Sequence, residues 1–272
     1  MRTIKLFMKK FSKIPLEFDN ILPEKLYDKT QKQVEETIIY RGNRKEPLNK
    51  YFKVTIDGTT TNPDECTIIM DGNMERVKYI GNLMSCGSII VNSNVDLHVG
   101  AQMSGGYIRV NGNTESYAGR EMTGGLLEIK GNTKEFLGSS YAGEWRGMSG
   151  GCIIVEGSAG RYAGDCMLNG QIIIKKNCDI LVGNHMSGGY IEVDGNITRW
   201  PGGSMKKGVI VVGGCVDEVL QGFKKQEKIH NPLINNKYHI GTYTLYTGDN
   251  TCLLYTSPSP RDATLSRMPS SA

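Results

Sequence analysis

A thirteen-residue pattern that recurs seven times constrains the fold of this chain more than any other feature. It contains Gly or Trp, then Met, Gly, Ile or Leu, and Ile or Val at fixed places, and it ends with Gly in most copies. Successive Met residues lie 19 residues apart, except for one interval of 26. The copies are 81–93, 100–112, 119–131, 145–157, 164–176, 183–195 and 202–214. Self-similarity at a fixed period is typical of proteins that stack equivalent units, so it comes before composition in any fold assignment.

Each copy predicts one short strand followed by a corner. The two apolar residues after the second Gly are separated by one residue, which places both on the same, buried face of a strand. The strand ends at Gly followed by Asn, as in Gly112-Asn113, and both residue types tolerate the positive φ of a corner. We expect a second short strand in the linker, as in 115–118, and inward-pointing Met, Ile, Leu and Val side chains. An amide ladder is expected at one corner from Asn113, Asn132, Asn177 and Asn196.

These units predict an all-β fold, a single-stranded parallel β-helix of about seven or eight coils with small N- and C-terminal caps. The expected divisions are an N-terminal cap at 1–64, the β-helix at 65–222, a C-terminal cap at 223–251 and a tail at 252–272. In the N-terminal cap, one or two helical turns precede a strand at Lys53–Ile56. The tail is rich in Ser and Pro, has no periodicity and resembles translated adapter sequence, so we treat it as non-native.

The repeated glycines have two interpretations. Gly at a fixed place in every coil is what a tight corner requires, whereas a nest of backbone N–H groups around a phosphate is the alternative. A dinucleotide-binding loop would follow a single strand and open a single helix. The glycines here recur in every copy instead, so we favour corners.

Charge and cysteine usage argue against several classes of function. Residues 1–53 carry a net charge of +6, residues 54–222 carry −5 and residues 223–272 carry +3, so the repeats offer no basic stripe for nucleic acid. No apolar run is long enough for a membrane span. The seven cysteines form no Cys-x-x-Cys pair, which favours free thiols in the cytoplasm over an iron–sulfur or zinc site. His98 and His185 occupy different places in their repeats. We therefore expect no catalytic, cofactor-binding or metal-binding residue.

The single interval of 26 residues predicts an insertion at the middle of the stack. The repeat beginning at Met122 keeps its register through Gly138, but nine residues rather than two then precede Met148. The seven extra residues must bulge out at a corner, and they carry Tyr141, Trp145 and Arg146. Aromatic and Arg residues are enriched at interface hot spots, so we predict that these three side chains contact a partner protein. The alternative is that Trp145 folds back and covers the coil edge.

The repeats, together with YRGNRKEPLNKYFKV at 40–54, resemble the C subunit of formylmethanofuran dehydrogenase. The resemblance covers roughly residues 15–250 and includes Gly42-Asn43-Arg44 just before the repeats. The repeats alone are also similar to the C-terminal β-helix domain of the glutamate synthase large subunit. The Gly-Asn-Arg segment favours the dehydrogenase.

The resemblance implies a structural subunit, without an active site of its own, in a cytoplasmic complex. That complex reduces CO2 with ferredoxin-type electrons and forms N-formylmethanofuran in the first step of methanogenesis from CO2. The implied partners are an amidohydrolase-like subunit with a two-metal site, a subunit with a tungsten or molybdenum pterin, and iron–sulfur subunits. A separate spacer or regulatory β-helix of the glutamate synthase type is the alternative. A polysaccharide-acting β-helix would need acidic residues on adjacent coils, whereas Glu128 and Glu192 lie three coils apart.

Overall fold

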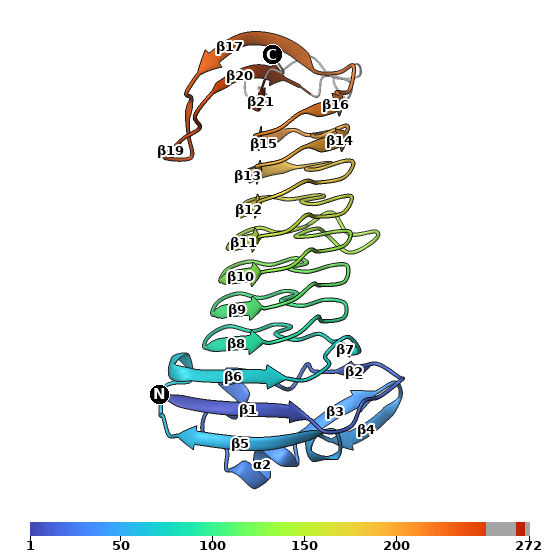
Figure 1. Ribbon diagram of the computed structural model, residues 1–272, viewed down its shortest axis with the longest axis vertical. Helices are drawn as coiled ribbons and strands as arrows, with labels where there is room; N and C mark the ends of the chain where they lie inside the picture. The colour runs from blue at the N-terminus through green and yellow to red at the C-terminus, as the bar shows by residue number, and fades with distance from the viewer. Residues whose placement is uncertain (249–264, 270–272) are drawn as a thin grey trace.

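The computed structural model of the protein describes residues 1–248 and the backbone of residues 265–269. Strands dominate and the helices are short, which confirms the predicted all-β class (Figure 1). The N-terminal elements are β1 (Arg2–Met8), β2 (Leu16–Glu17), α1 (Pro23–Leu26), α2 (Gln31–Glu35), β3 (Ile38–Arg41), β4 (Arg44–Pro47) and β5 (Phe52–Gly58). Two 3-10 turns lie at Leu48–Lys50 and Pro63–Glu65.

The repeats supply most of the remaining strands. They are β6 (Cys66–Asp71), β7 (Val77–Lys78), β8 (Ser88–Val91), β9 (Tyr107–Val110), β10 (Leu126–Ile129), β11 (Cys152–Val155), β12 (Gln171–Ile174), β13 (Ser187–Val193), β14 (Ile197–Arg199), β15 (Lys207–Val212) and β16 (Val216–Glu218). The C-terminal strands are β17 (Lys224–His230), β18 (Leu233–Ile234), β19 (Lys237–Tyr238), β20 (Thr242–Thr247) and β21 (Leu265–Pro269).

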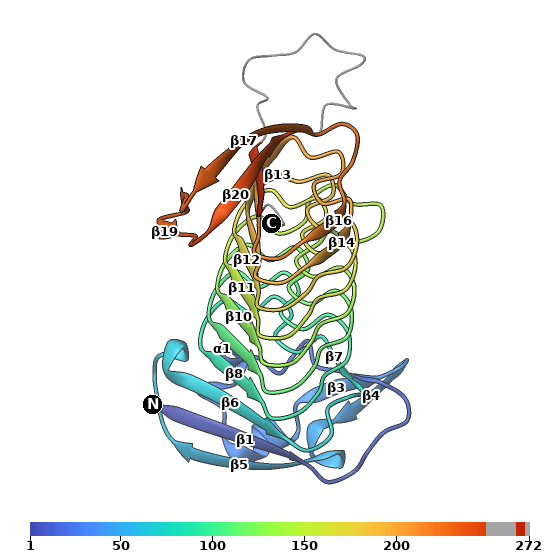
Figure 2. The same ribbon diagram turned by 45° about the horizontal axis from the view of Figure 1, so that its top comes forward.

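The main sheet runs the length of the molecule and is mixed. From β6 through β15 each strand pairs in parallel with the strand of the next repeat, and equivalent residues lie opposite one another, as Ile89 does to Ile108. Antiparallel pairs occur at the ends, where β5 lies beside β1 and β17 beside β20. Figure 2 shows the repeats stacked one above another between these ends. The prediction of a second strand at 115–118 is wrong, because the chain turns at 116–120. A single parallel bridge just before this turn takes its place in most repeats, such as Val95 with Thr114.

The interior of the stack is a set of apolar columns. Every repeat Met from Met84 to Met205 is at most 2% exposed, and the paired Ile, Leu and Val residues of β8 to β12 are fully buried. The alternation of buried and half-buried residues is the same in these five strands, as the period of two requires. The expectation of inward-pointing side chains at these places is confirmed.

The glycine after each strand-opening Met is required by backbone packing. Gly151 has a φ of +82°, and an added Cβ would lie within 2.8 Å of three backbone atoms of Gly124 and Gly125 in the repeat below. Because a backbone carbonyl of a stacked neighbour cannot swing away as a side chain can, only Gly fits there. The glycines are therefore explained by close stacking of corners.

The predicted asparagine ladder forms, but it joins side chain to backbone. The Asn94 side-chain oxygen accepts from the backbone N–H of Asn113, and Asn113 in turn accepts from the N–H of Asn132. Asn177 and Asn196 continue the pattern toward the C-terminal end. Each Asn thereby satisfies a corner N–H of the following repeat.

Different secondary-structure elements cover the two ends of the stack. At the N-terminal end, β1 pairs in parallel with β6 and is followed by β5, so the sheet continues past the first repeat. The helix α2 begins at a capping box formed by Thr30 and Gln33. At the other end, β17 and β20 form an antiparallel pair. Most of the tail at 252–272 lies outside the described residues, but the backbone of β21 pairs with β20. No helix among the described residues is long and apolar enough to cross a membrane.

Candidate functional site

The insertion leaves the stack at one corner without disturbing the register of its neighbours. Gly138 donates to the carbonyl of Ala118 in the repeat below, and Met148 donates to the carbonyl of Gly138 at 3.0 Å. Gly138 has a φ of +62°, which matches the corner glycines Gly119 and Gly164. Trp145, which stands in the first position of the motif copy 145–157, does not lie at this corner. Gly138 holds the corner, and the chain from 139 to 147 is looped out, as the spacing had predicted.

The two stems of the insertion are hydrogen-bonded to the following repeat. The backbone N–H of Ser140 donates to the carbonyl of Asp165, and the N–H of Gly147 donates to the carbonyl of Cys166 at 2.9 Å. Between these stems, Glu144 donates its backbone N–H to the carbonyl of Tyr141. The loop therefore has fixed ends and a short internal turn.

The three residues predicted to contact a partner differ in their surroundings. Trp145 is 84% exposed, so it does not cover the edge of the stack. Tyr141 is 48% exposed, and its ring lies 5.8 Å from that of Tyr117 and beneath the guanidinium group of Arg120. Arg146 is exposed on the surface. Tyr141 is thus the residue that folds back, while Trp145 and Arg146 project from the loop.

An aromatic ladder that sequence reasoning missed runs beneath Tyr141. Neighbouring rings along it stack with centroids 4.8 to 5.2 Å apart. The members are Tyr79, His98, Tyr117, Phe136 and Tyr162. All five have φ between +59° and +66°, a region that costs a non-Gly residue about 1–2 kcal/mol. Stacking contributes about 0.5–1.5 kcal/mol per aromatic pair and offsets much of that strain.

His98 is the ladder member with unusual electrostatics. It is 8% exposed, and its Nδ1 has no hydrogen-bond partner. Burial, together with the nearby charges of Arg120 and Lys78, lowers the pKa of His98 to about 4. The ring is therefore neutral at pH 7 and stacks between Tyr79 and Tyr117 as an aromatic group.

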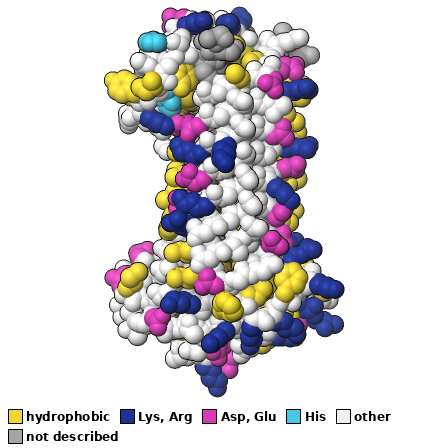
Figure 3. All heavy atoms as spheres, viewed as in Figure 1, with side chains coloured by type: hydrophobic (Ala, Val, Ile, Leu, Met, Phe, Trp, Pro, Cys, Tyr) yellow, Lys and Arg dark blue, Asp and Glu magenta, His cyan; other side chains and the backbone are white. Residues whose placement is uncertain are grey.

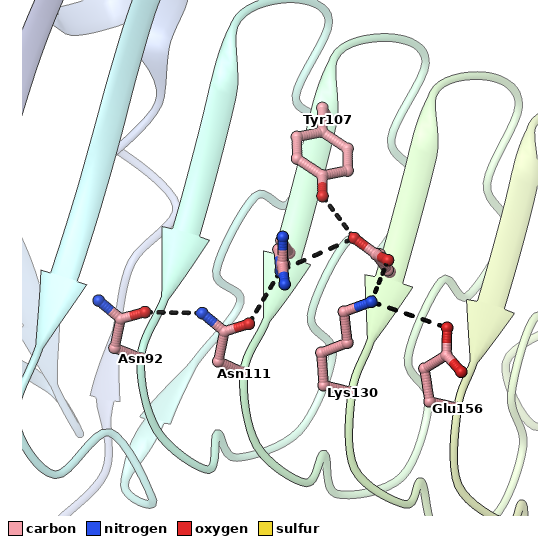
Figure 4. A network of polar contacts seen from close by, with 7 residues as sticks. Asn92, Tyr107, Asn111, Lys130 and Glu156 are labelled. Carbon is pink, nitrogen blue, oxygen red and sulfur yellow. Dashed lines mark hydrogen bonds and ion pairs between the residues drawn. The ribbon is translucent and has the colours of Figure 1, made fainter.

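The outer face of the strands carries polar networks that link neighbouring repeats. Glu128 on β10 accepts hydrogen bonds from Tyr107 on β9 and from Lys130, and Lys130 lies 3.7 Å from Glu156 (Figure 4). Hydrogen bonds from Lys130 and Tyr107 hold the pKa of Glu128 below its ordinary value. Asn111 extends the network by donating to Asn92 at 2.7 Å. Glu128 is thus an ionised structural acceptor.

A polysaccharide-acting site would need acidic residues on adjacent repeats, and Glu128 and Glu192 do not meet this requirement. Ile154 and Ile173 separate the two carboxylates in the column of paired residues, as the spacing had predicted. Glu192 is 3% exposed and is bound by Tyr190 and Lys237. Two carboxylates that cleave a glycosidic bond lie within about 10 Å and face a common cleft. These two are held in separate structural networks.

Ion pairs between repeats neutralise much of the surface of the stack. Lys134 lies 2.8 Å from Glu115 of the preceding repeat, and Lys175 lies 3.1 Å from Asp194 of the following one. Figure 3 shows acidic and basic side chains alternating along the stack, with Lys and Arg gathered at the N-terminal end. The stack therefore presents no continuous stripe of one charge on this face.

The ligand-type residues do not fit an iron–sulfur cluster. Such clusters are held by four thiolates, or by two thiolates and two imidazoles. Within the part of the chain that the structure describes, the group of three or more ligand-type side chains is Asp165, Cys166 and His185, with a single thiol. Sequence reasoning did not find this group, because it compared histidines only with histidines.

Comparisons with known proteins point to one family name. The C subunit of a tungsten-containing formylmethanofuran dehydrogenase 2 from Methanococcus maripaludis is 50% identical over 135 residues, which is 50% of this chain and 48% of that protein. The corresponding Methanothermobacter wolfeii protein is 42% identical over 99 residues, 36% of each chain. The C subunit of a molybdenum-containing formylmethanofuran dehydrogenase 1 from Methanothermobacter marburgensis is 40% identical over 86 residues, 32% of this chain and 20% of that protein. The predicted resemblance is confirmed.

The matched segments span between a fifth and about half of the length of these relatives. No family model matches the chain. A solved structure, the formyltransferase/hydrolase complex from Methylorubrum extorquens with methylofuran, contains a chain with a TM-score of 0.80 and 22% identity. The likeness covers 98% of this chain and all of that one, and it shows a shared fold. The similarity to glutamate synthase stays a prediction.

Proposed function

We propose that this chain is the C subunit of a formylmethanofuran dehydrogenase and acts as its non-catalytic structural subunit. The observation that carries the proposal is the 50% identity over 135 residues to a protein of that name. The complex would reduce CO2 with ferredoxin-type electrons and form N-formylmethanofuran. The amidohydrolase-like, tungsten- or molybdenum-containing and iron–sulfur subunits would hold the catalytic centres. The names of the relatives include both tungsten and molybdenum enzymes.

The repeats would form a single-stranded parallel β-helix of seven or eight coils, capped by 1–64 and 223–251. This part of the proposal is supported by the parallel pairing of equivalent residues from β6 to β15 and by the parallel bridges on the second side. Such a body is stiff, because each coil is hydrogen-bonded to both neighbours. The six described cysteines are free, which suits a reducing cytoplasm.

Purification of the native chain with its partners tests the assignment. Affinity capture from the source cells followed by mass spectrometry should recover an amidohydrolase-like subunit, a tungsten or molybdenum subunit and iron–sulfur subunits in fixed ratio. Recovery of glutamate synthase subunits instead would support the alternative spacer role. Recovery of the chain alone would contradict both assignments.

The insertion would dock one of these subunits through Tyr141, Trp145 and Arg146. Support comes from the exposed Trp145 ring on a loop whose two stems are hydrogen-bonded to the stack. A buried interface hot spot is worth about 2 kcal/mol or more, so replacing all three residues by Ala should reduce recovery of the partner more than tenfold. Tyr238→Ala, which removes another 65% exposed aromatic ring, is the matched control. A folded triple variant that still assembles fully would refute docking by this loop.

A further inference from the structure

A small pocket lies against the insertion and contains three side chains of ligand type. It has a volume of about 290 Å³ and is lined on one side by Tyr141 and Trp145. Asp165, Cys166 and His185 line the other side. Cys166 and His185 occupy the same place in adjacent repeats, immediately before Met167 and Met186 respectively. Stacking of the repeats therefore brings a thiol and an imidazole together.

The three ligand atoms converge. The Asp165 carboxylate oxygen, the Cys166 sulfur and a His185 ring nitrogen all lie within 4.8 Å of one another. Asp165 Oδ1 and His185 Nδ1 are 3.4 Å apart, and the amide nitrogen of Asn184 lies 2.8 Å from each of them. In the tautomer with the proton on Nε2, His185 Nδ1 accepts from that amide, and its lone pair then points at the same nitrogen as Asp165 Oδ1. Asp165 Oδ1 and His185 Nδ1 thus both point at the position of the Asn184 amide nitrogen. A cation bound at this position would use the same two atoms as ligands.

The backbone at Cys166 and His185 is fixed by hydrogen bonds to the following repeat. Cys166 donates its N–H to the carbonyl of Asn184, and His185 donates to the carbonyl of Gly203, at 2.8 and 2.7 Å. Both residues have a positive φ, +56° for Cys166 and +53° for His185, which turns their side chains out at the corner. Asp165 and Cys166 also accept the hydrogen bonds that hold the insertion stems. Such preorganisation lowers the entropic cost of binding.

We propose that Asp165, Cys166 and His185 form a binding site for a transition-metal cation of the Zn²⁺ type. Sulfur, imidazole nitrogen and carboxylate oxygen are the ligands that zinc takes in proteins, and two nitrogen or oxygen ligands bound tetrahedrally at about 2.0–2.1 Å lie about 3.3 Å apart. Ca²⁺ and Mg²⁺ favour sites made of oxygen ligands alone, so the thiol and imidazole select against them. The fourth position faces the pocket and takes water. This proposal replaces the sequence-based expectation that the chain binds no metal.

Binding at this site releases a proton. The thiolate is the form of Cys that binds a metal, so the Cys166 thiol loses its proton to solvent as the metal–thiolate bond forms. No electron is transferred. Metal affinity should therefore rise with pH. Because Asp165 and Cys166 hold the stems of the insertion, a bound cation would also stiffen the loop that carries Trp145.

Metal titration of the full-length chain tests the site independently of the proposed complex. After treatment with chelator, the protein should bind one equivalent of Zn²⁺ in calorimetry. Co²⁺ in its place should give a thiolate-to-cobalt charge-transfer band. Cys166→Ser should remove that band, and both Cys166→Ser and His185→Gln should weaken binding more than about tenfold, a loss of at least 1.4 kcal/mol. Cys152→Ser and His230→Gln, which alter a half-buried thiol and an exposed imidazole outside the cluster, should bind as the unaltered chain does.

Three results would overturn the proposal. They are the absence of stoichiometric binding, an unchanged charge-transfer band in Cys166→Ser, and equal losses in the cluster and control variants. Circular dichroism confirms that each variant is folded. His185 is exposed, so His185→Gln keeps the test decisive even if Cys166→Ser fails to fold.

Discussion

The stacked repeats and the insertion between β10 and β11 constrain their side chains in opposite ways. Met122 and Met148, on either side of the insertion, are fully buried, whereas Trp145 within it is 84% exposed. In the stack, each residue packs against its own equivalents one repeat away. The insertion has no equivalent in any neighbouring repeat. Packing against equivalent residues therefore restricts which residue types the stack can hold. Side chains of the insertion have no such packing and are available to bind a partner protein.

Two glycines test whether close packing constrains the stack more than the insertion. Gly151 and Gly143 both have positive φ, but an added Cβ meets three backbone atoms at Gly151 and nothing within 4 Å at Gly143. Gly151→Ala should lower the free energy of unfolding by about 2–5 kcal/mol, the sum of backbone strain and overpacking. Gly143→Ala should cost only the strain, about 1–2 kcal/mol. Denaturant unfolding measures both, and equal losses would show that stacking is not the constraint.

The aromatic ladder gives a second test, with an effect that depends on pH. The pKa of His98 is about 4 in the folded chain, below the value of about 6.5 in an unfolded chain. As the pH falls through this window the unfolded chain takes up a proton that the folded chain does not, so stability declines. The loss should reach about 3 kcal/mol near pH 4.

His98→Phe should keep the ring stacking and remove this part of the pH dependence. Thermal unfolding between pH 7 and pH 4 measures it, and His230→Phe, at an exposed position, is the control. If His98→Phe and the unaltered chain lose stability in parallel, the buried neutral ring is not the cause.

The sequence predicted the repeats and the buried apolar columns well, but it did not predict the aromatic ladder or the group of Asp165, Cys166 and His185. Period, buried residues and corner glycines follow from spacing, because stacking repeats the same contact at the same place. The ladder was missed because its members sit at a positive φ that propensity does not predict for Tyr or Phe. The insertion also lengthens the stretch of sequence between Phe136 and Met148. Phe136 therefore does not align with the other ladder members when the repeats are aligned on their Met residues. The group of Asp165, Cys166 and His185 escaped notice because the two residues that share a column, Cys166 and His185, are of different type.

Removal of the insertion tests whether the stack folds without it and whether the insertion binds the partner subunits. Deleting 141–147 leaves Gly138-Ser139-Ser140-Met148, which restores the common Gly-x-x-Met spacing and a 19-residue interval. A same-length Gly/Ser replacement of 141–147 is the control that keeps the chain length. We predict that the deletion variant folds with less than about 2 kcal/mol lost, since the stack loses the ring contacts of Tyr141 and two hydrogen bonds, from Tyr141 to Glu121 and from Gly147 to Cys166. Neither variant should then recover the partner subunits. Unfolding of the deletion variant, or full assembly by either variant, would contradict the account.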